Sequence, residues 1–249
     1  DGLMCIFDNE LTDEDAALVL KEMGIPDSVQ CIKAVRRILS GPKSKPRLHG
    51  DRAILKVLIP VAIMELKERE DAYQILVTFE KLLSRSTTLY LLHDIFTSAP
   101  KIVSMLINTF SYSSYLTNLI LSNIDLLDYV YDPKDTKYSA KEVADDMWER
   151  TKQYRDDLEL ELEASRIRHR AYIFNVGYAY LNKTINVIDM MTSLTELAKG
   201  TVDYAFRSVY EDLVRRYGKP LNEDGSLCRY LLIGMGKVGS IEMSFGSDI

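Results

Sequence analysis

The chain has 249 residues, 47% hydrophobic and 27% charged, which is the composition of a globular protein rather than of a disordered or fibrous one. Its net charge of -6 argues against broad binding to nucleic acid. The apolar stretch 53–66 is interrupted by Lys56, Pro60 and Glu65, so we expect neither a membrane span nor membrane binding.

The first third of the chain shows four helical patterns separated by short breaks. Thr12, with Asp15 three residues later, predicts a capped helix start. A basic loop is expected at residues 41–46, where Pro and Gly interrupt the pattern. Pro60 predicts a kink in the third helix. The predicted helices are residues 12–24, 27–40, 51–69 and 71–84.

The helical patterns continue to residue 217. Pro100 is well placed as the first residue of a helix, and Asp132-Pro133 breaks the chain. The stretch 140–192 predicts one or two long helices, with charges on a solvated face. The other predicted helices are residues 89–97, 100–110, 115–127 and 193–217. The last carries one apolar stripe: Leu194, Leu197, Ala198, Val202, Ala205, Val209 and Leu213.

Cysteine and histidine are too sparse for metal or triad chemistry. The three cysteines are far apart and match no metal-ligand spacing, so we expect reduced thiols in a cytoplasmic protein. No histidine has a partner at the spacing of a zinc site or a catalytic triad, and we interpret all three as surface or core residues. These residues are Cys5, Cys31, Cys228, His49, His93 and His169.

A basic stretch of the long helical region has two interpretations. Arg166, Arg168 and Arg170, with His169 between them, are candidates for contact with a nucleotide or a partner protein. Alternating basic residues on a helix more often form a solvated face.

The periodicity changes after residue 218. Residues 222–225, NEDG, form a turn cluster, and residues 228–233 contain a short apolar run typical of a buried strand. We therefore expect an α/β element to begin near residue 226.

A glycine motif follows the predicted strand. Gly234, Gly236 and Gly239 form Gly-x-Gly-x-x-Gly, which after a strand is the dinucleotide-binding fingerprint. That function requires a long helix next, a second strand, and an acidic residue about 20 positions on. Here the pattern breaks within two turns at Gly246-Ser247, which argues against dinucleotide binding.

A phosphate-binding turn fits this segment better. Backbone amides of a glycine-rich turn face phosphate oxygens, and Lys237 supplies a cation. In nucleotidyl transfer, two carboxylates two positions apart on a strand hold divalent metals that bridge the triphosphate. Asp248 would be the first of these carboxylates, and the second would come after Ile249.

Residues 234–249, GMGKVGSIEMSFGSDI, resemble the active-site signature of bacterial glutamine synthetase adenylyltransferases (glutamate-ammonia ligase adenylyltransferases). In that nucleotidyltransferase family Gly-x-Gly-Lys-x-Gly-x-x-Glu is followed by Ser-Asp-x-Asp. Ser240 stands where the family usually has a second glycine. The resemblance extends over residues 75–249; its other segments are 84–128, a helical connector, 166–170, a basic helix, and 193–220, the helix before the signature.

The resemblance implies transfer of AMP from ATP to a tyrosine of glutamine synthetase, in the regulation of nitrogen assimilation. Asp248 would be catalytic and would bind Mg²⁺, with ATP as substrate. Glutamine synthetase would be the partner, and a nitrogen-regulatory PII protein is a further candidate. The implied nucleotide-binding residues are Gly234, Gly236, Lys237, Gly239, Ser240, Glu242 and Ser247.

Two other functions stay open. The family carries a second, deadenylylating half that removes AMP by phosphorolysis, and Met235 and Ile249 resemble that half. Ile241, Gly246 and the upstream connector resemble the adenylylating half, which we favour. A noncatalytic helical scaffold that binds glutamine synthetase is the third alternative.

The expected fold is mainly α: a multi-helix bundle leading into the truncated start of an α/β nucleotidyltransferase domain. We expect an N-terminal helical region at 1–74, the connector and preceding helices at 75–220, and the first strand and active-site turn at 221–249. Because Asp1 is not methionine and Ile249 follows what resembles structured sequence, we expect a fragment of a longer enzyme that is catalytically inactive alone.

Overall fold

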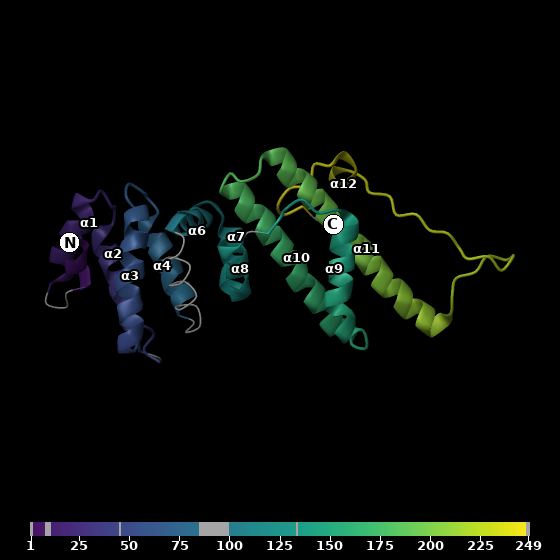
Figure 1. Ribbon diagram of the computed structural model, residues 1–249, viewed down its shortest axis with the longest axis horizontal. Helices are drawn as coiled ribbons and strands as arrows, with labels where there is room; N and C mark the ends of the chain where they lie inside the picture. The colour runs from purple at the N-terminus through teal and green to yellow at the C-terminus, as the bar shows by residue number, and fades with distance from the viewer. Residues whose placement is uncertain (1, 8–10, 45, 85–99, 133, 248–249) are drawn as a thin grey trace. The chain divides into compact units, whose positions relative to one another are not determined.

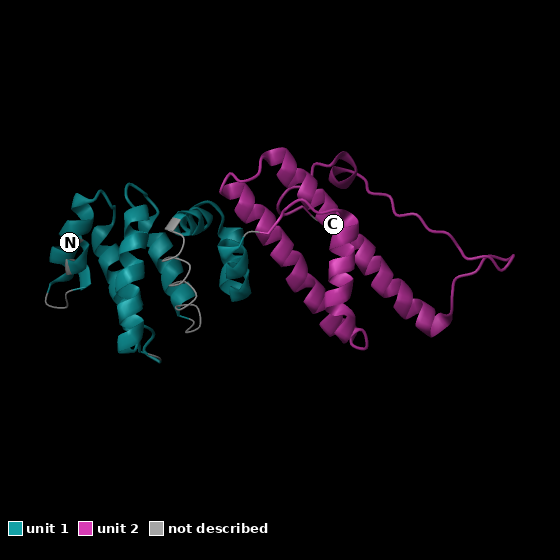
Figure 2. Ribbon diagram, in the orientation of Figure 1, with its two compact units in different colours: residues 1–132 teal, residues 133–249 magenta. Residues whose placement is uncertain are grey.

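The computed structural model describes residues 2–7, 11–44, 46–84, 100–132 and 134–247. The chain divides into two compact units, residues 1–132 and 133–249 (Figure 2). The boundary falls at Asp132-Pro133, the predicted break. The three-part division expected from the sequence stays a prediction.

Unit 1 is a set of short helices, as predicted. The Thr12 hydroxyl accepts a hydrogen bond from the Asp15 amide at 3.1 Å, which confirms the predicted cap. α2 packs between α1 and α4, and α3 packs on α6. The elements are η1 (Gly2–Phe7), α1 (Asp13–Glu22), α2 (Ser28–Ser40), α3 (His49–Glu65), α4 (Ala72–Leu83), α6 (Pro100–Tyr112), α7 (Ser114–Ser122), η2 (Ile124–Leu126) and α8 (Leu127–Tyr131).

Two of the predicted helices of unit 1 have different bounds in the structure. The helix predicted over 115–127 is interrupted, because Asn123 adopts an extended conformation and its side chain accepts from the Asp125 amide at 3.1 Å. α3 begins before Asp51, whose carboxylate caps it by accepting from the Leu48 amide at 3.2 Å. Pro60 lies inside α3. The helix predicted over 89–97 lies outside the described residues.

Unit 2 is built on α9, α10 and α11, and the last two are longer than any described helix of unit 1 (Figure 1). Its elements are α9 (Ala140–Thr151), η3 (Lys152–Tyr154), α10 (Leu158–Leu181), α11 (Val187–Tyr217) and the short α12 (Lys237–Ser240). Both α9 and α10 pack on α11. α11 begins six residues before the predicted start because the Asn186 side chain caps it, accepting from the amides of Ile188 and Asp189 at 2.9 Å each. None of the described helices combines the length and the hydropathy that a membrane-spanning segment requires.

The contact of α9 with α11 depends on Gly200. A Cβ atom at Gly200 would lie 2.5 Å from the carbonyl oxygen of Ala140 and 2.6 Å from Cβ of Val143, so the two backbones meet where no side chain fits. The core around this contact consists of Val143, Ala144, Met147, Leu197 and Tyr204, all buried. Small residues at such crossings bring helix axes close together and allow the flanking side chains to interlock.

One charged residue of the predicted solvated face is buried instead. Glu161 on α10 is 4% exposed. Its Oε1 accepts hydrogen bonds from the Tyr204 hydroxyl at 3.1 Å and from the Ser208 hydroxyl at 2.9 Å, both on α11. A carboxylate leaves water at low cost only when its oxygens find such donors, so these bonds hold α10 against α11.

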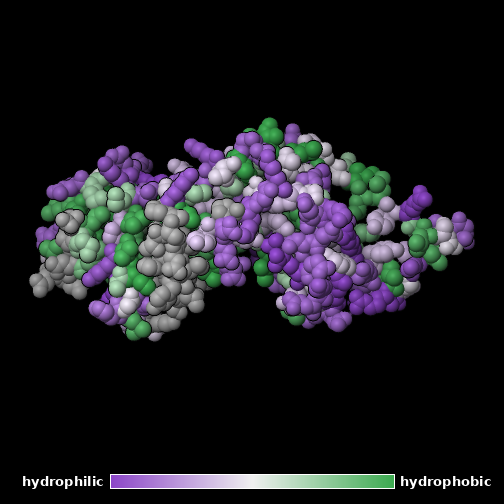
Figure 3. All heavy atoms as spheres, viewed as in Figure 1, coloured by the Kyte–Doolittle hydropathy of each residue, from purple (hydrophilic) through white to green (hydrophobic). Residues whose placement is uncertain are grey.

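The buried strand predicted at 228–233 is wrong for the described chain. These residues have extended backbone without strand pairing and are exposed; Leu231 is 79% and Ile233 73% exposed. They belong to the segment after α11 that carries hydrophobic side chains on its surface (Figure 3). The only ladder contact among the described residues is a bridge between Leu221 and Leu227. A strand is buried only where neighbouring strands pair with it, and no described segment does so here.

The apolar stripe of α11 is buried over its first half alone. Leu194, Leu197 and Ala198 are buried, whereas Val209 is 51% and Leu213 48% exposed. α9 and α10 therefore cover the stripe only in part.

We predict that Gly200→Ala lowers the free energy of unfolding by about 1–3 kcal/mol, because the added methyl overlaps the α9 backbone. Gly50→Ala is the matched control, since a Cβ there meets nothing within 4 Å; alanine's helix propensity should leave stability equal or raise it by up to about 1 kcal/mol. Urea unfolding followed by circular dichroism measures both. Equal stability of the two variants would contradict the close approach.

Candidate nucleotide-binding turn

The chain returns along α11 before it reaches the glycine motif. α11 ends at Gly218, which has a φ of 83° and donates its amide to the Val214 carbonyl at 2.9 Å. Tyr230, in the exposed segment, packs on α11, its ring centroid 4.1 Å from that of Phe206 and 6.1 Å from that of Tyr210. This aromatic cluster positions the extended segment against the helix.

Each motif glycine meets a separate geometric requirement. Gly236 has a φ of 58°, in the left-handed region that glycine adopts without strain. A Cβ at Gly234 would lie 2.8 Å from Cγ1 of Val238, and one at Gly239 would lie 2.8 Å from the Gly234 carbonyl oxygen. The motif thus excludes a side chain by close contact at Gly234 and Gly239, and by backbone conformation at Gly236.

The helix after this turn is too short for a dinucleotide site. α12 spans Lys237–Ser240 and ends at Ile241, whose φ of 60° is left-handed. A dinucleotide fingerprint continues into a long helix whose N-terminus faces the pyrophosphate. The structure therefore confirms the sequence argument against that function.

Three of the polar side chains predicted to bind nucleotide are exposed to solvent. Lys237, Ser240 and Glu242 are all exposed. The Ser240 hydroxyl lies 3.0 Å from Oε2 of Glu242 and 3.1 Å from the Gly236 carbonyl oxygen, so it donates to one of the two. The Glu242 amide donates to the Lys237 carbonyl at 2.9 Å. The backbone amides of the first turn of a helix have no acceptor within the helix and remain able to bind an anion.

Ser247 belongs to a second small turn. Its amide donates to the Ser244 carbonyl oxygen at 3.1 Å, and its Oγ accepts from the Ser244 amide at 3.2 Å. In this structure the Ser247 hydroxyl thus closes its own turn. Asp248, the candidate catalytic and metal-binding residue, lies outside the described residues. Within the part of the chain that is described, no group of three or more His, Cys, Asp or Glu residues is placed to hold a metal ion.

Sequence reasoning missed the residue that anchors the motif. Met243 is 3% exposed, and with Val176, Met190, Leu194 and Ala198 it forms a core cluster. Val238 and Phe245 pack against the same cluster. The available signal was the alternation of polar and apolar residues in Glu-Met-Ser-Phe, 242–245. Through this anchor the turn is attached to α10 and α11.

Two residues of the basic stretch of α10, Arg168 and His169, contact neighbouring helices. Arg166 pairs with Glu163 on the same helix, and both Arg166 and Arg170 are exposed. Arg168 forms an ion pair with Asp146 of α9, whose pKa falls because its hydrogen bonds to Arg168 and Arg150 outweigh burial. His169 Nδ1 lies 3.0 Å from the Thr201 hydroxyl of α11. That hydroxyl donates to the Leu197 carbonyl at 2.8 Å and therefore accepts from Nδ1–H of His169. Neither contact leaves these side chains facing a nucleotide.

The fold and the turn together define a helical bundle followed by a glycine turn. The sequence profile of glutamate-ammonia ligase adenylyltransferase matches residues 103–249, more than half of the chain. The chain belongs to this family.

Its relatives are considerably longer. A bifunctional glutamine synthetase adenylyltransferase/adenylyl-removing enzyme of Hahella chejuensis is 27% identical over 251 residues, which cover 96% of this chain and 25% of that enzyme. Proteins of the same name from Pseudomonas putida and Pseudomonas syringae pv. tomato are 27% and 28% identical, over 95% and 96% of this chain. The chain spans about a quarter of the length of each.

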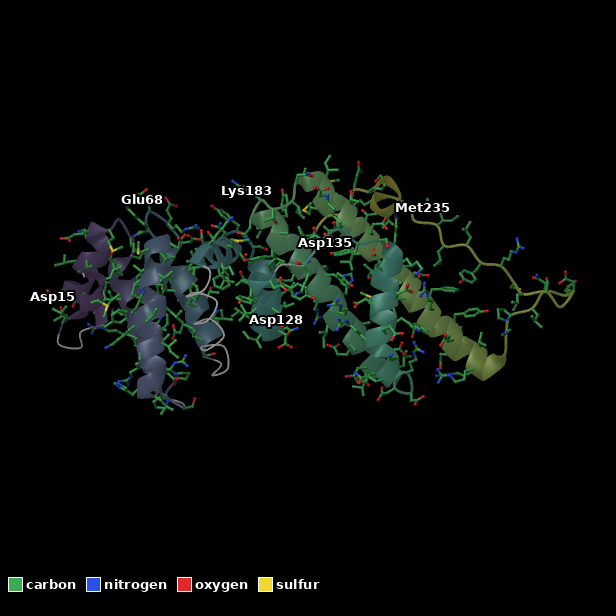
Figure 4. The ribbon with its side chains drawn as sticks, viewed as in Figure 1. Asp15, Glu68, Asp128, Asp135, Lys183 and Met235 are labelled. Carbon is green, nitrogen blue, oxygen red and sulfur yellow. The ribbon has the colours of Figure 1, made fainter. Side chains whose placement is uncertain are left out.

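We predict that Met243→Ala frees the glycine turn. Loss of a buried methionine side chain costs about 2 kcal/mol or more, so amides of residues 234–247 should exchange with solvent roughly 30-fold faster. Met235→Ala is the matched control, because Met235 lies beside α12 with its side chain 82% exposed (Figure 4). Hydrogen exchange read by mass spectrometry measures this rate. Equal exchange rates in the two variants would show that Met243 does not anchor the turn.

We also predict a pH dependence from His169. Burial, and next the nearby Arg170, lower its pKa below the ordinary value of 6.5. The unfolded chain therefore takes up the proton first, and the free energy of unfolding falls as pH drops below 6.5. Urea titrations between pH 8 and pH 5 should show a shallower fall for His169→Gln than for the wild type. If the free energy of unfolding of His169→Gln fell with pH as steeply as that of the wild type, His169 would not contribute to the pH dependence.

Proposed function

We propose that the chain is part of an adenylyltransferase that moves AMP from ATP to a tyrosine of glutamine synthetase. The observation that carries the proposal is the glycine turn, which lies within the family match at residues 103–249. The turn excludes a side chain at Gly234 and Gly239 by close contact, and Gly236 has a positive φ. The names of the relatives contain this activity.

The turn supports a positioning role in phosphoryl transfer. The tyrosine oxygen attacks the α-phosphorus of ATP, the bond to pyrophosphate breaks, and the tyrosine proton passes to solvent. In the proposal, amides of residues 236–239 bind phosphate oxygens, and the exposed Lys237 ammonium offsets their charge. The Ser240 amide already donates to the Gly236 carbonyl at 2.9 Å. The Ser240 hydroxyl lies within hydrogen-bond distance of Glu242 Oε2, at 3.0 Å, and in the proposal this contact orients the two side chains.

Magnesium enters the proposal through Asp248 alone. The described residues supply no group that fits a metal ion, so they give no basis for a step that involves Mg²⁺. Asp248 and Ser247 match the family's Ser-Asp-x-Asp pattern, and carboxylates of that kind hold the cation that accompanies a triphosphate.

The direction of transfer and the further partners belong to the proposal too. We favour adenylylation over phosphorolytic removal because the helical connector upstream resembles the adenylylating half. Because the relatives carry both activities in their names, each variant needs both measurements. A PII protein as regulator and a cytoplasmic location complete the proposal.

The test is transfer of label from [α-³²P]ATP to glutamine synthetase by the full-length protein that contains this chain. We expect Asp248→Asn to lower transfer by at least about 100-fold and Lys237→Gln by about tenfold. Lys219→Gln is the matched control, since Lys219 is an exposed lysine outside the glycine turn. It should leave transfer unchanged.

Other outcomes identify the alternatives. Phosphate-dependent loss of AMP from adenylylated glutamine synthetase, abolished by Asp248→Asn while transfer persists, would assign this chain to the deadenylylating half. A third outcome is that the protein binds glutamine synthetase while Asp248→Asn and Lys237→Gln affect neither activity. This result would support the scaffold function and overturn the proposal.

A further inference from the structure

Unit 1 contains a groove that the family signature does not account for. It has a volume of about 630 Å³ and lies where the C-terminal end of α2 meets the N-terminal turns of α3. α2 and α3 are neighbours in unit 1 (Figure 1). Its lining residues are Phe7, Arg36, Arg37, Leu39, Ser40, His49, Arg52, Ala53 and Lys56.

The lining is basic although the chain as a whole is acidic. Among the nine lining residues that the structure describes, four are Arg or Lys, one is His, and none is Asp or Glu, whereas the whole chain carries a net charge of -6. A concentration of one sign of charge in a concave surface raises the local potential and attracts ligands of the opposite sign.

Two of the four strong cations are fixed by acidic partners outside the lining. Arg36 forms an ion pair with Asp13 at 2.9 Å and donates to the Leu11 carbonyl at 2.6 Å. Arg37 binds Glu80 at 2.9 Å, and the pKa of Arg37 is raised by that carboxylate despite some desolvation. These two guanidinium groups are thereby held in place at the α2 side of the groove.

The other two strong cations have no such partner. Arg52 and Lys56 are exposed, and no described residue forms an ion pair or a hydrogen bond with either side chain. With His49 they occupy positions i, i+3 and i+7 of α3, which share one helix face. Asp51 is engaged at the start of α3, where its carboxylate accepts from the Leu48 amide at 3.2 Å.

The groove has the size of a site for a small molecule. Pockets for such ligands typically enclose about 300–1,000 Å³ and combine apolar walls with a few polar groups. Phe7, Leu39 and Ala53 supply the apolar part here. Arginine and lysine together are the side chains that bind phosphate oxygens.

We propose that this groove binds a small polyanion of the phosphate class, with Arg52 and Lys56 as its direct ligands. The apolar walls fit an organic group that carries the phosphates. The site shares no residue with the glycine turn, so it goes beyond the proposed transferase function and stands or fails independently of it.

Chemical footprinting of the full-length protein tests the proposal at single residues. Inorganic triphosphate is the probe. Phenylglyoxal modifies arginine and acetic anhydride modifies lysine, and mass spectrometry reads each site. We expect at least fivefold protection of Arg52 and Lys56 in 150 mM salt. Protection of Lys21 and Lys33, exposed lysines of α1 and α2 outside the lining, should stay below 1.5-fold.

A variant pair separates the site from general charge. A bound anion should also protect Arg37, which lines the groove. Arg52→Gln with Lys56→Gln should abolish that protection, whereas Lys21→Gln with Lys33→Gln removes the same charge and should preserve it. Equal protection at Arg52, Lys56, Lys21 and Lys33 would overturn the proposal. So would a lack of protection at Arg52 and Lys56. So would protection by an oligoglutamate peptide but not by triphosphate, because the ligand would then be an acidic protein segment. Protection at Lys237 reports on the glycine turn alone.

Discussion

Unit 2 depends on the close approach of α9 to α11 at Gly200. Because the carbonyl of Ala140 and the side chain of Val143 occupy the space that a Cβ would need, the helices sit near enough for Met147, Leu197 and Tyr204 to form one core. That packing places the Tyr204 hydroxyl next to Glu161 at 3.1 Å. The buried carboxylate then fixes α10 on α11, and all three helices form a rigid support.

The candidate site packs on these helices at the N-terminal half of α11. Met243 inserts into the cluster of Val176, Met190 and Leu194, so the glycine turn is attached by an apolar side chain while its backbone and polar side chains stay exposed. This division suits a phosphate site. Anion binding needs backbone donors held in a fixed geometry, and an apolar anchor supplies that geometry without competing for the donors.

Unit 1 presents charge in a different way. Asp13 and Glu80 hold Arg36 and Arg37 at the edge of the basic groove, and Arg52 and Lys56 extend into solvent from the opposite helix. An ion pair holds a cation in position, but the carboxylate offsets part of its electrostatic potential. An unpaired cation keeps its full potential and has a more mobile side chain. A groove that has both kinds can orient an anion and still bind it.

The sequence by itself determined the helices and the motif. Caps such as Thr12 and breaks such as Gly218 act within a few residues, through hydrogen bonds that the local chain supplies. The glycine spacing and the family resemblance over residues 234–249 were equally visible. Only the tertiary structure decided which residues are buried. Glu161 belongs to a charged helix face, yet it is buried against α11. The hydroxyl groups that donate hydrogen bonds to it there lie 43 and 47 residues away in the sequence. Residues 228–233 have the composition of a buried strand, yet no described segment pairs with them. Burial depends on partners that are distant in sequence, and a local pattern does not contain them.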